Sequence, residues 1–132
     1  MLGAVDAAER EDPRLARLRE ICVALPEAEC ERHGRHAQFR VRGRTFAYFL
    51  DDHHGDGRVG LNAKAPEGAA DALVEAAPDR FHRPAYLGHH GWIGLHLDVG
   101  EIDWDEVAGV VTESYVLVAP KRLARDVLSS ER

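Results

Sequence analysis

A group of basic side chains lies within residues 31–65, which carry seven Lys or Arg and four Asp or Glu although the whole chain has a net charge of −6. Three of its arginines share one parity around Arg42-Gly43, a dipeptide typical of a tight hairpin turn, so we expect them to project from one face. Such guanidinium groups can hold phosphates by charge and hydrogen bonds. The predicted nucleic-acid-binding residues are Arg40, Arg42, Arg44, Arg58 and Lys64. An ordinary solvated face is the alternative interpretation.

Aromatic and cationic residues alternate in the irregular segment 79–91, which is rich in Pro, Gly and His. Aromatic walls with a few cationic or polar groups are typical of a pocket for a small ligand or a peptide. The residues predicted to line this cleft are Phe81, Tyr86, His89 and Trp92. Alternatively, the Tyr and Trp rings close one end of the core and the prolines hold the loop flat.

Residues for nucleophilic catalysis are scarce. The serines are Ser114, Ser129 and Ser130, and none lies in a Gly-x-Ser-x-Gly turn. Cys22 falls on the apolar face of a predicted helix, where a thiol is buried and inert, and nothing in the sequence orients Cys30 for attack. The chain has no Gly-Lys-Ser/Thr phosphate-binding loop. We therefore predict that the protein is not an enzyme.

Eight histidines are the most unusual feature of the composition. His33-x-x-His36 and the loop 51–56, which contains His53 and His54, offer side chains that ligate zinc or nickel. Neither Cys-x-x-Cys nor His-Glu-x-x-His occurs, however. We predict no dedicated metal site and no cofactor, so a metal-dependent role at His53 and His54 is the weakest of three functional hypotheses.

The composition is typical of one globular domain. The chain has 132 residues, of which 45% are hydrophobic, enough to form a core. No apolar run approaches the ~20 residues of a membrane span, and the acidic first residues lack the hydrophobic centre of a secretion signal. Two cysteines do not make a disulfide scaffold, so a reducing cytoplasm fits best. The negative net charge counts against a protein that coats nucleic acid through bulk positive charge.

The hydrophobic pattern predicts the elements that must position these residues. Helices are predicted from Asp12 to Leu25, Pro66 to Ala77, Asp103 to Val118 and Pro120 to Leu128. Strands are predicted near residues 39–41, 46–50, 58–62 and 92–97. Phe46, Tyr48 and Leu50 recur with a period of two, which places them on one face. The pattern indicates an α+β fold, with an antiparallel sheet of about five strands, helices mainly on one face, and the order α-β-β-β-α-β-α-α.

Several short motifs, taken in order along the chain, resemble a known family. They are Leu25-Pro26-Glu27, Phe39–Ala47, Asp79-Arg80-Phe81, Pro84–Gly88, Gly91-Trp92-Ile93 and Leu117–Leu123. This succession, found between about Leu15 and Leu128, resembles the MmcQ/YjbR family of small bacterial proteins. The resemblance implies a compact α+β fold of the frataxin-like or secretion-chaperone-like kind, a DNA-binding function and no catalytic residues.

The expected organisation is a flexible N-terminus over residues 1–11, one domain over 12–128 and a short tail over 129–132. The expected function is that of a DNA-binding or regulatory module, using the Arg-rich hairpin, in the bacterial cytoplasm and away from membranes. A module that binds a small ligand or a partner protein through the aromatic cleft is the alternative.

Overall fold

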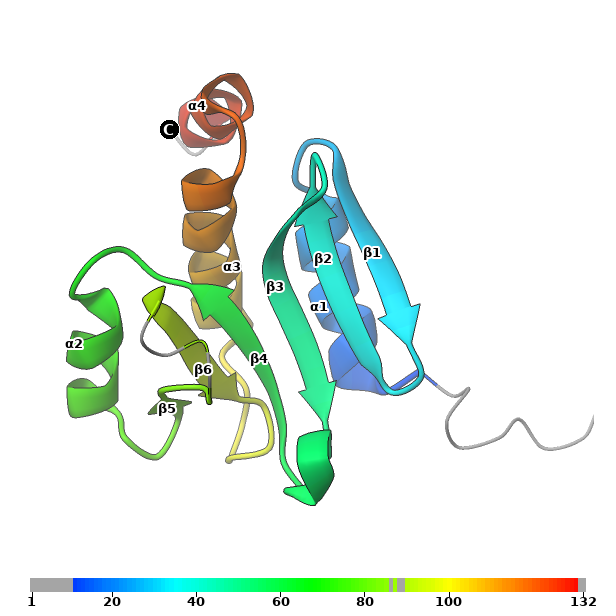
Figure 1. The fold of residues 1–132 in the computed structure, drawn as a ribbon, viewed down its shortest axis with the longest axis vertical. Coiled ribbons are helices and arrows are strands. Elements are labelled where there is room, and N and C mark those ends of the chain that lie inside the picture. The colour runs from blue at the N-terminus through cyan, green and yellow to red at the C-terminus, as the bar shows by residue number, and fades with distance from the viewer. Residues whose placement is uncertain (1–10, 86, 88–89, 131–132) are drawn as a thin grey trace, which may run out of the picture.

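In the computed structural model of the chain, six antiparallel strands form one open sheet in the order β1-β2-β3-β4-β6-β5 (Figure 1). The structure describes residues 11–85, 87 and 90–130. The strands are β1 (Ala28–His33), β2 (His36–Val41), β3 (Arg44–Asp51), β4 (Val59–Lys64), β5 (Phe81–His82) and β6 (Trp92–His96). The predicted α+β class with an antiparallel sheet is confirmed. The structure also contains the charged strand β1 and the two-residue strand β5, which the predicted strand ranges do not include. Neither strand has the alternation of apolar residues from which a strand can be predicted.

Four helices accompany the sheet: α1 (Pro13–Val23), α2 (Ala69–Ala76), α3 (Trp104–Val118) and α4 (Lys121–Ser130). Helices α1 and α3 pack on the same face of the sheet, behind the strands in Figure 1. Helix α2 lies beside β5, and α4 packs against α3. In the part of the chain that the structure describes, no α-helix covers the other face.

Local signals set the helix starts. The Asp12 carboxylate accepts a hydrogen bond from the Arg14 N–H (2.8 Å), and Pro13 occupies the first helical position of α1. The Asp103 carboxylate caps α3 by accepting hydrogen bonds from the N–H groups of Asp105 and Glu106 (3.0 and 3.2 Å). Both caps lie where the sequence predicts them, because capping is decided within four residues.

Some element ends differ from the prediction. Helix α2 begins at Ala69 rather than Pro66, because Gly68 adopts a left-handed conformation (φ 80°) directly before it. Helix α4 runs to Ser130, beyond the predicted end at Leu128, so part of the expected tail is helical. The expected flexible N-terminus lies outside the described residues except for Glu11, whose carboxylate forms an ion pair with Arg19.

A β-bulge changes which side chains of β3 face the core. Phe39 pairs with Ala47 but Arg40 pairs with Thr45, so Phe46 is an extra residue in the β2–β3 ladder. Phe46 and Ala47 are consequently both fully buried. Tyr48 and Leu50 are half-buried and lie on the opposite face. The expectation that Phe46, Tyr48 and Leu50 share one face is therefore wrong, and the bulge is the physical reason.

The core fills the space between the sheet and helices α1 and α3. Its largest buried side chains are Tyr115, Phe39, Phe46, Phe49 and Phe81. The Phe46 and Tyr115 rings meet edge to face with their centroids 5.4 Å apart, which joins β3 to α3. Among the described residues, no helix combines the length and the apolar character that a membrane crossing requires.

Candidate functional site

The open face is the face of the sheet that points away from α1 and α3. Its central side chains are Gln38 and Arg40 of β2, Tyr48 and Leu50 of β3, Asn62 and Lys64 of β4, His82 of β5, and Trp92 and His96 of β6. The register places Tyr48 and Gly94 beside Asn62, and Trp92 beside Lys64. The open face therefore brings together members of both predicted sites, which are far apart in sequence.

Two of the predicted phosphate-binding arginines are held in ion pairs. Arg40 contacts the Glu31 carboxylate on the neighbouring strand β1. Arg42, in the turn between β2 and β3, donates two hydrogen bonds to Glu27, with Nε–Oε1 and Nη2–Oε2 distances of 2.6 and 3.0 Å. The partner carboxylate raises the pKa of Arg42. Each guanidinium would have to leave or share a carboxylate before it could bind a phosphate.

Arg58 lies at the other end of the sheet from the hairpin. It donates two hydrogen bonds to Asp98, with Nε–Oδ2 and Nη2–Oδ1 distances of 3.0 and 2.9 Å. The Asp98 carboxylate also accepts the Val59 N–H (2.8 Å), and these contacts lower its pKa to about 2, with the Arg58 hydrogen bonds as the largest cause. Arg58 therefore clamps the end of β4 to the segment after β6 and does not join the other predicted cations.

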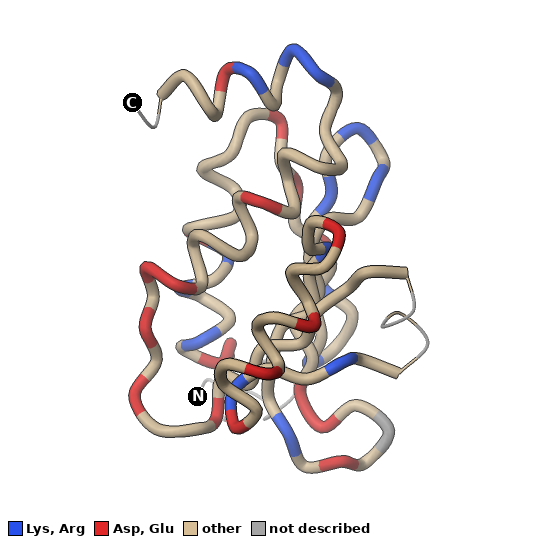
Figure 2. The backbone as a smooth tube through the Cα atoms, turned by 90° about the vertical axis from the view of Figure 1, so that its left-hand side faces the viewer, with Lys and Arg blue, Asp and Glu red and all other residues tan. Residues whose placement is uncertain are grey.

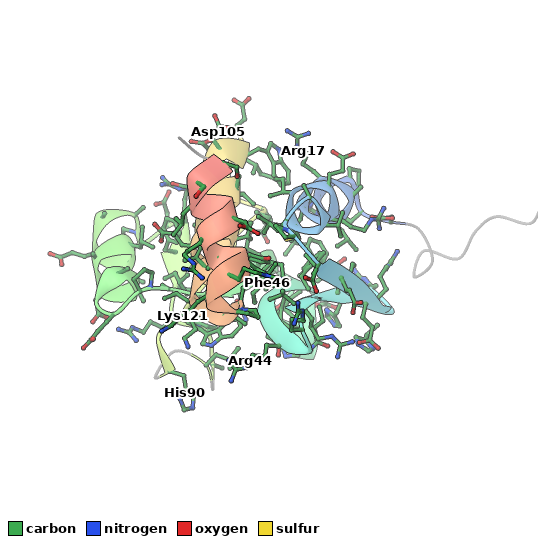
Figure 3. All side chains as sticks on the ribbon, turned by 90° about the horizontal axis from the view of Figure 1, so that it is seen from above. Arg17, Arg44, Phe46, His90, Asp105 and Lys121 are labelled. Atoms are coloured by element: carbon green, nitrogen blue, oxygen red, sulfur yellow. The ribbon has the colours of Figure 1, made fainter. Side chains whose placement is uncertain are left out.

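Arg44 and Lys64 form no ion pair within the described residues. Arg44 is exposed at the hairpin, where the register pairs it with the buried Val41, and Figure 3 shows it away from Phe46, which points toward the helices. Lys64 is half-buried on the open face, and its backbone N–H donates to Ser114 Oγ (2.9 Å). These two residues are the members of the predicted basic set whose charges stay available to a ligand.

Helix α4 adds cations that sequence analysis did not place in the site. Lys121 and Arg122 begin this helix at the same end of the molecule as the β2–β3 hairpin (Figure 2). Arg122 Nη2 lies 3.7 Å from Glu27, the carboxylate that also holds Arg42. We call Arg42, Arg44, Lys121 and Arg122 the basic end. Only the tertiary structure brings the two segments together, because nearly eighty residues separate them.

The open face also contains a cleft of about 410 Å³ beside β5. Its lining residues are Tyr48, Leu50, His53, Asp56, Asn62, His82, Pro84, Ala85 and Leu87. Apolar side chains form most of the wall, and Asn62, which is 8% exposed, lies at its floor. We call this the open-face cleft. Apolar walls with a few convergent polar groups are the usual construction of a small-molecule site.

A stacked imidazole pair borders the open-face cleft. The rings of His82 and His96 lie 4.4 Å apart at 17°. The His82 ring covers Gly94, where an added Cβ would come within 2.3 Å of it. Burial, followed by the neighbouring His96, lowers the pKa of His82, and burial lowers the pKa of His96. Both rings are therefore neutral at pH 7, and each can donate or accept a hydrogen bond.

One polar atom of this pair has no partner. The Nδ1 atom of His82 is buried and forms no hydrogen bond within the described residues. Such atoms are rare in folded proteins, because desolvation without a hydrogen bond is unfavourable.

A second histidine pair lies at the β3–β4 loop. The rings of His36 and His53 meet edge to face with a centroid distance of 5.4 Å. His36 Nδ1 accepts a hydrogen bond from the Asp51 N–H (3.1 Å), and burial lowers the pKa of His36. The side chain of His54 lies outside the described part of the chain. Within that part, no three His, Cys, Asp or Glu side chains lie together as metal ligands.

The residues predicted to line the aromatic cleft have different positions. Phe81 is only 1% exposed and lies in the core, on the opposite face from the open-face cleft. Trp92 is half-buried and packs against Tyr48 on the open face, with ring centroids 5.7 Å apart at 44°. Tyr86 and His89 lie outside the described residues. Sequence analysis missed Tyr48 as a lining residue because the bulge in β3 reverses its face.

Comparison with known proteins supports one assignment. The YjbR family model matches residues 23–117, and the comparison with curated proteins found no match. Among solved structures, the chain is similar in fold to the Deinococcus radiodurans protein DR2400, which carries the domain DUF419. The TM-score is 0.62 at 23% sequence identity, over 76% of this chain and 74% of that chain. Because the family model spans the sheet, the open-face cleft and most of α3, this chain belongs to the YjbR family.

Proposed function

We propose that the protein is a non-enzymatic binding module that holds a small, planar, largely uncharged ring system in the open-face cleft. The observation that carries this proposal is the cleft itself, which combines a ligand-sized volume of about 410 Å³ with apolar walls and a polar floor. Tyr48 offers a ring for stacking, and Asn62 and His82 offer hydrogen bonds to ring heteroatoms. Asp56 is the one charged residue among the described lining, which favours a ligand without negative charge.

The state of the nucleophilic side chains supports a role without catalysis. Ser114 is fully buried in the core, and its hydroxyl donates to the Phe46 carbonyl (2.6 Å). Cys22 is also buried, and burial strongly raises the pKa of its thiol. Burial raises the pKa of Cys30 as well. Both cysteines are free thiols, which supports the bacterial cytoplasm as the location of the protein.

A thermal-shift screen against neutral heteroaromatic molecules tests the proposal. A ligand that binds only the folded state raises the Tm, and the neighbouring Trp92 supplies a fluorescence signal for titration. Tyr48→Ala should abolish the shift, because it removes a wall of the cleft. Val23→Ala, an exposed position on α1, should retain the shift. A screen without any shift, or a shift that survives in Tyr48→Ala, would refute the proposal.

A second candidate function is duplex DNA binding at the basic end. It is favoured by the position of Lys121 and Arg122 at the start of α4, where a helix dipole favours negative charge. Lys121 and Arg122 add two positive charges near Arg44, so the electrostatic potential at the basic end is positive.

Fluorescence anisotropy of a labelled duplex at low and at physiological salt tests this second candidate. The double variant Lys121→Gln with Arg122→Gln should weaken binding and flatten its salt dependence. Arg58→Gln, at the other end of the sheet, is the control and should bind normally. Absence of binding at low salt would exclude duplex DNA as the ligand.

A further inference from the structure

Three zones follow one another along the open face, from the β3–β4 loop toward the β2–β3 hairpin. The open-face cleft comes first, with Asn62 at its floor. The Tyr48–Trp92 pair comes next. Lys64 follows at the hairpin side, beside Trp92. Asn62 and Lys64 lie two residues apart on the same face of β4, about 7 Å at the usual rise of a strand.

The aromatic pair is suited to stacking. Tyr48 and Trp92 are half-buried, so each ring keeps part of its surface in contact with solvent. Their centroids are 5.7 Å apart and their planes are inclined at 44°, which leaves ring surface uncovered between them. Aromatic side chains on an open antiparallel sheet can stack unpaired bases, and stacking tolerates any base because every base has a π face.

The cleft is suited to the edge of a ring that carries hydrogen-bond donors and acceptors. The Asn62 amide supplies both a donor and an acceptor, and the His82 imidazole adds a hydrogen-bonding group through Nε2. In a duplex, the matching edge of a base is occupied by its complement. A base can enter this cleft only when it is unpaired.

We infer that the open face binds single-stranded nucleic acid, with one base in the open-face cleft, a neighbouring base stacked on Tyr48 and Trp92, and a phosphate beside Lys64. The inference rests on the proposed function, because it names the occupant of the same cleft. A free nucleotide shares the chemistry of one base and one phosphate, so the test must separate it from a strand.

The charge distribution sets the expected salt dependence. Arg40 is held by Glu31, so among the described residues of this face Lys64 is the cation that remains for a phosphate. Each phosphate neutralised on a single strand contributes about −0.7 to the slope of log K against log salt concentration, so one phosphate beside Lys64 gives a slope of about −0.7. Binding should therefore depend on stacking more than on charge, as suits a chain with a net charge of −6.

The experiment compares three probes with tag-free, full-length protein. A labelled mixed-sequence single strand of about ten nucleotides and its duplex are titrated by anisotropy, and nucleoside 5′-monophosphates are titrated by Trp fluorescence. We expect the single strand to bind at least about tenfold more tightly than both the duplex and the monophosphates, because only a strand occupies all three zones.

Variants separate stacking from charge. Tyr48→Ala should weaken single-strand binding by about tenfold without changing the salt slope. Trp92→Leu, which keeps apolar bulk on the sheet, should also weaken single-strand binding. This variant tests stacking independently if Tyr48→Ala does not fold. Lys64→Gln should bring the slope of about −0.7 close to zero. Arg17→Gln, an exposed cation on α1 on the helix-covered side of the sheet, is the matched control and should leave single-strand binding unchanged.

The outcomes distinguish this inference from the function on which it rests. If neutral ring compounds bind the cleft but single strands do not, the inference is wrong and the proposed function stands. If monophosphates bind as tightly as the strand, the occupant is a free nucleotide and the inference is also overturned. If no ring ligand of any kind binds, both fail. Single-strand binding that survives Tyr48→Ala and Trp92→Leu would place the strand elsewhere and overturn the inference.

Discussion

At the scale of single residues, the contact between His82 and Gly94 shapes the border of the open-face cleft. The imidazole lies where a Cβ of residue 94 would be, so the ring can stack on His96 only because residue 94 is glycine. The need for glycine here is steric, since Gly94 is not among the residues with positive φ. The identity of residue 94 therefore decides the position of a cleft side chain on another strand.

Gly94→Ala should displace the His82 ring from the sheet. We expect the free energy of unfolding to fall by about 1 kcal/mol, measured by urea denaturation, and ligand binding in the cleft to weaken. Gly109→Ala in α3 is the matched control, because nothing lies within 4 Å of the added Cβ. That change should leave binding intact and raise stability by about 0.5–1 kcal/mol. Equal behaviour of the two variants would contradict the packing argument.

The buried imidazoles should make stability depend on pH. The pKa values of His82, His96 and His36 lie below the ordinary value of 6.5 in the folded protein, with burial as the largest cause. The unfolded chain therefore binds protons more readily. The contribution to stability is complete above about pH 6.5 and is lost as the pH falls through the lowered pKa values.

This pH dependence can be assigned to one ring. His82→Phe keeps an aromatic ring in the stack and removes the unpartnered Nδ1 atom, so we expect a weaker loss of stability between pH 7.5 and pH 5.5 in urea denaturation. His33→Phe, at an exposed position on β1, is the control and should retain the full pH dependence. A free energy of unfolding that rises when the wild-type protein is acidified would contradict the predicted direction of the pH dependence.

At the scale of elements, Ser114 joins helix α3 to two strands of the sheet. Its hydroxyl donates to the Phe46 carbonyl on β3 (2.6 Å) and accepts the Lys64 N–H at the end of β4 (2.9 Å). The side chain is fully buried, so no water can replace it without rearrangement. The bulged residue of β3 and the last residue of β4 are thus held by one helix position.

Ser114→Ala should lower the free energy of unfolding by about 2 kcal/mol or more, because it leaves a buried carbonyl and a buried N–H without a partner. Ser129→Ala, at an exposed position near the end of α4, should change it by less than about 0.5 kcal/mol. Chemical denaturation of both variants checks the difference. A small effect of Ser114→Ala would mean that neighbouring groups satisfy these two backbone atoms.

At the scale of the whole molecule, contacts between distant parts of the chain decide the shape of the basic end. The Tyr115 hydroxyl, near the end of α3, donates to the Pro26 carbonyl between α1 and β1 (2.6 Å). Glu27 then contacts both Arg42 of the hairpin and Arg122 of α4. The segments around Glu27, Arg42 and Arg122 therefore meet at one point.

Tyr115→Phe should reduce stability by about 1 kcal/mol, because it removes one hydrogen bond to a half-buried carbonyl and keeps the buried ring. It should also weaken duplex binding if the basic end is the duplex site, since the orientation of α4 relative to the hairpin depends on this contact. Tyr48→Phe on the open face is the control for stability and should be nearly neutral. Equilibrium denaturation of the two variants gives the comparison.

Much of the fold can be predicted from local pattern. The caps at Asp12 and Asp103, the turn at Arg42-Gly43 and the burial of Cys22 depend on neighbours within a few residues, and all are confirmed. The ordered motifs also identify the family. The alternation in β6 correctly separates Trp92, Gly94 and His96 from the core-facing residues.

The candidate site depends on the tertiary structure. Ion pairs of Arg40, Arg42 and Arg58 reach carboxylates 9, 15 and 40 residues away, so residue type alone could not show that these charges are occupied. The bulge at Phe46 reverses the face of Tyr48, and strand order then places Tyr48 beside Asn62 and against Trp92. The sequence by itself determined the helices, turns and most strands, because backbone preferences and capping act locally. Strand order, register and charge pairing were decided only when distant segments packed, because their energies depend on contacts that no short stretch of chain contains.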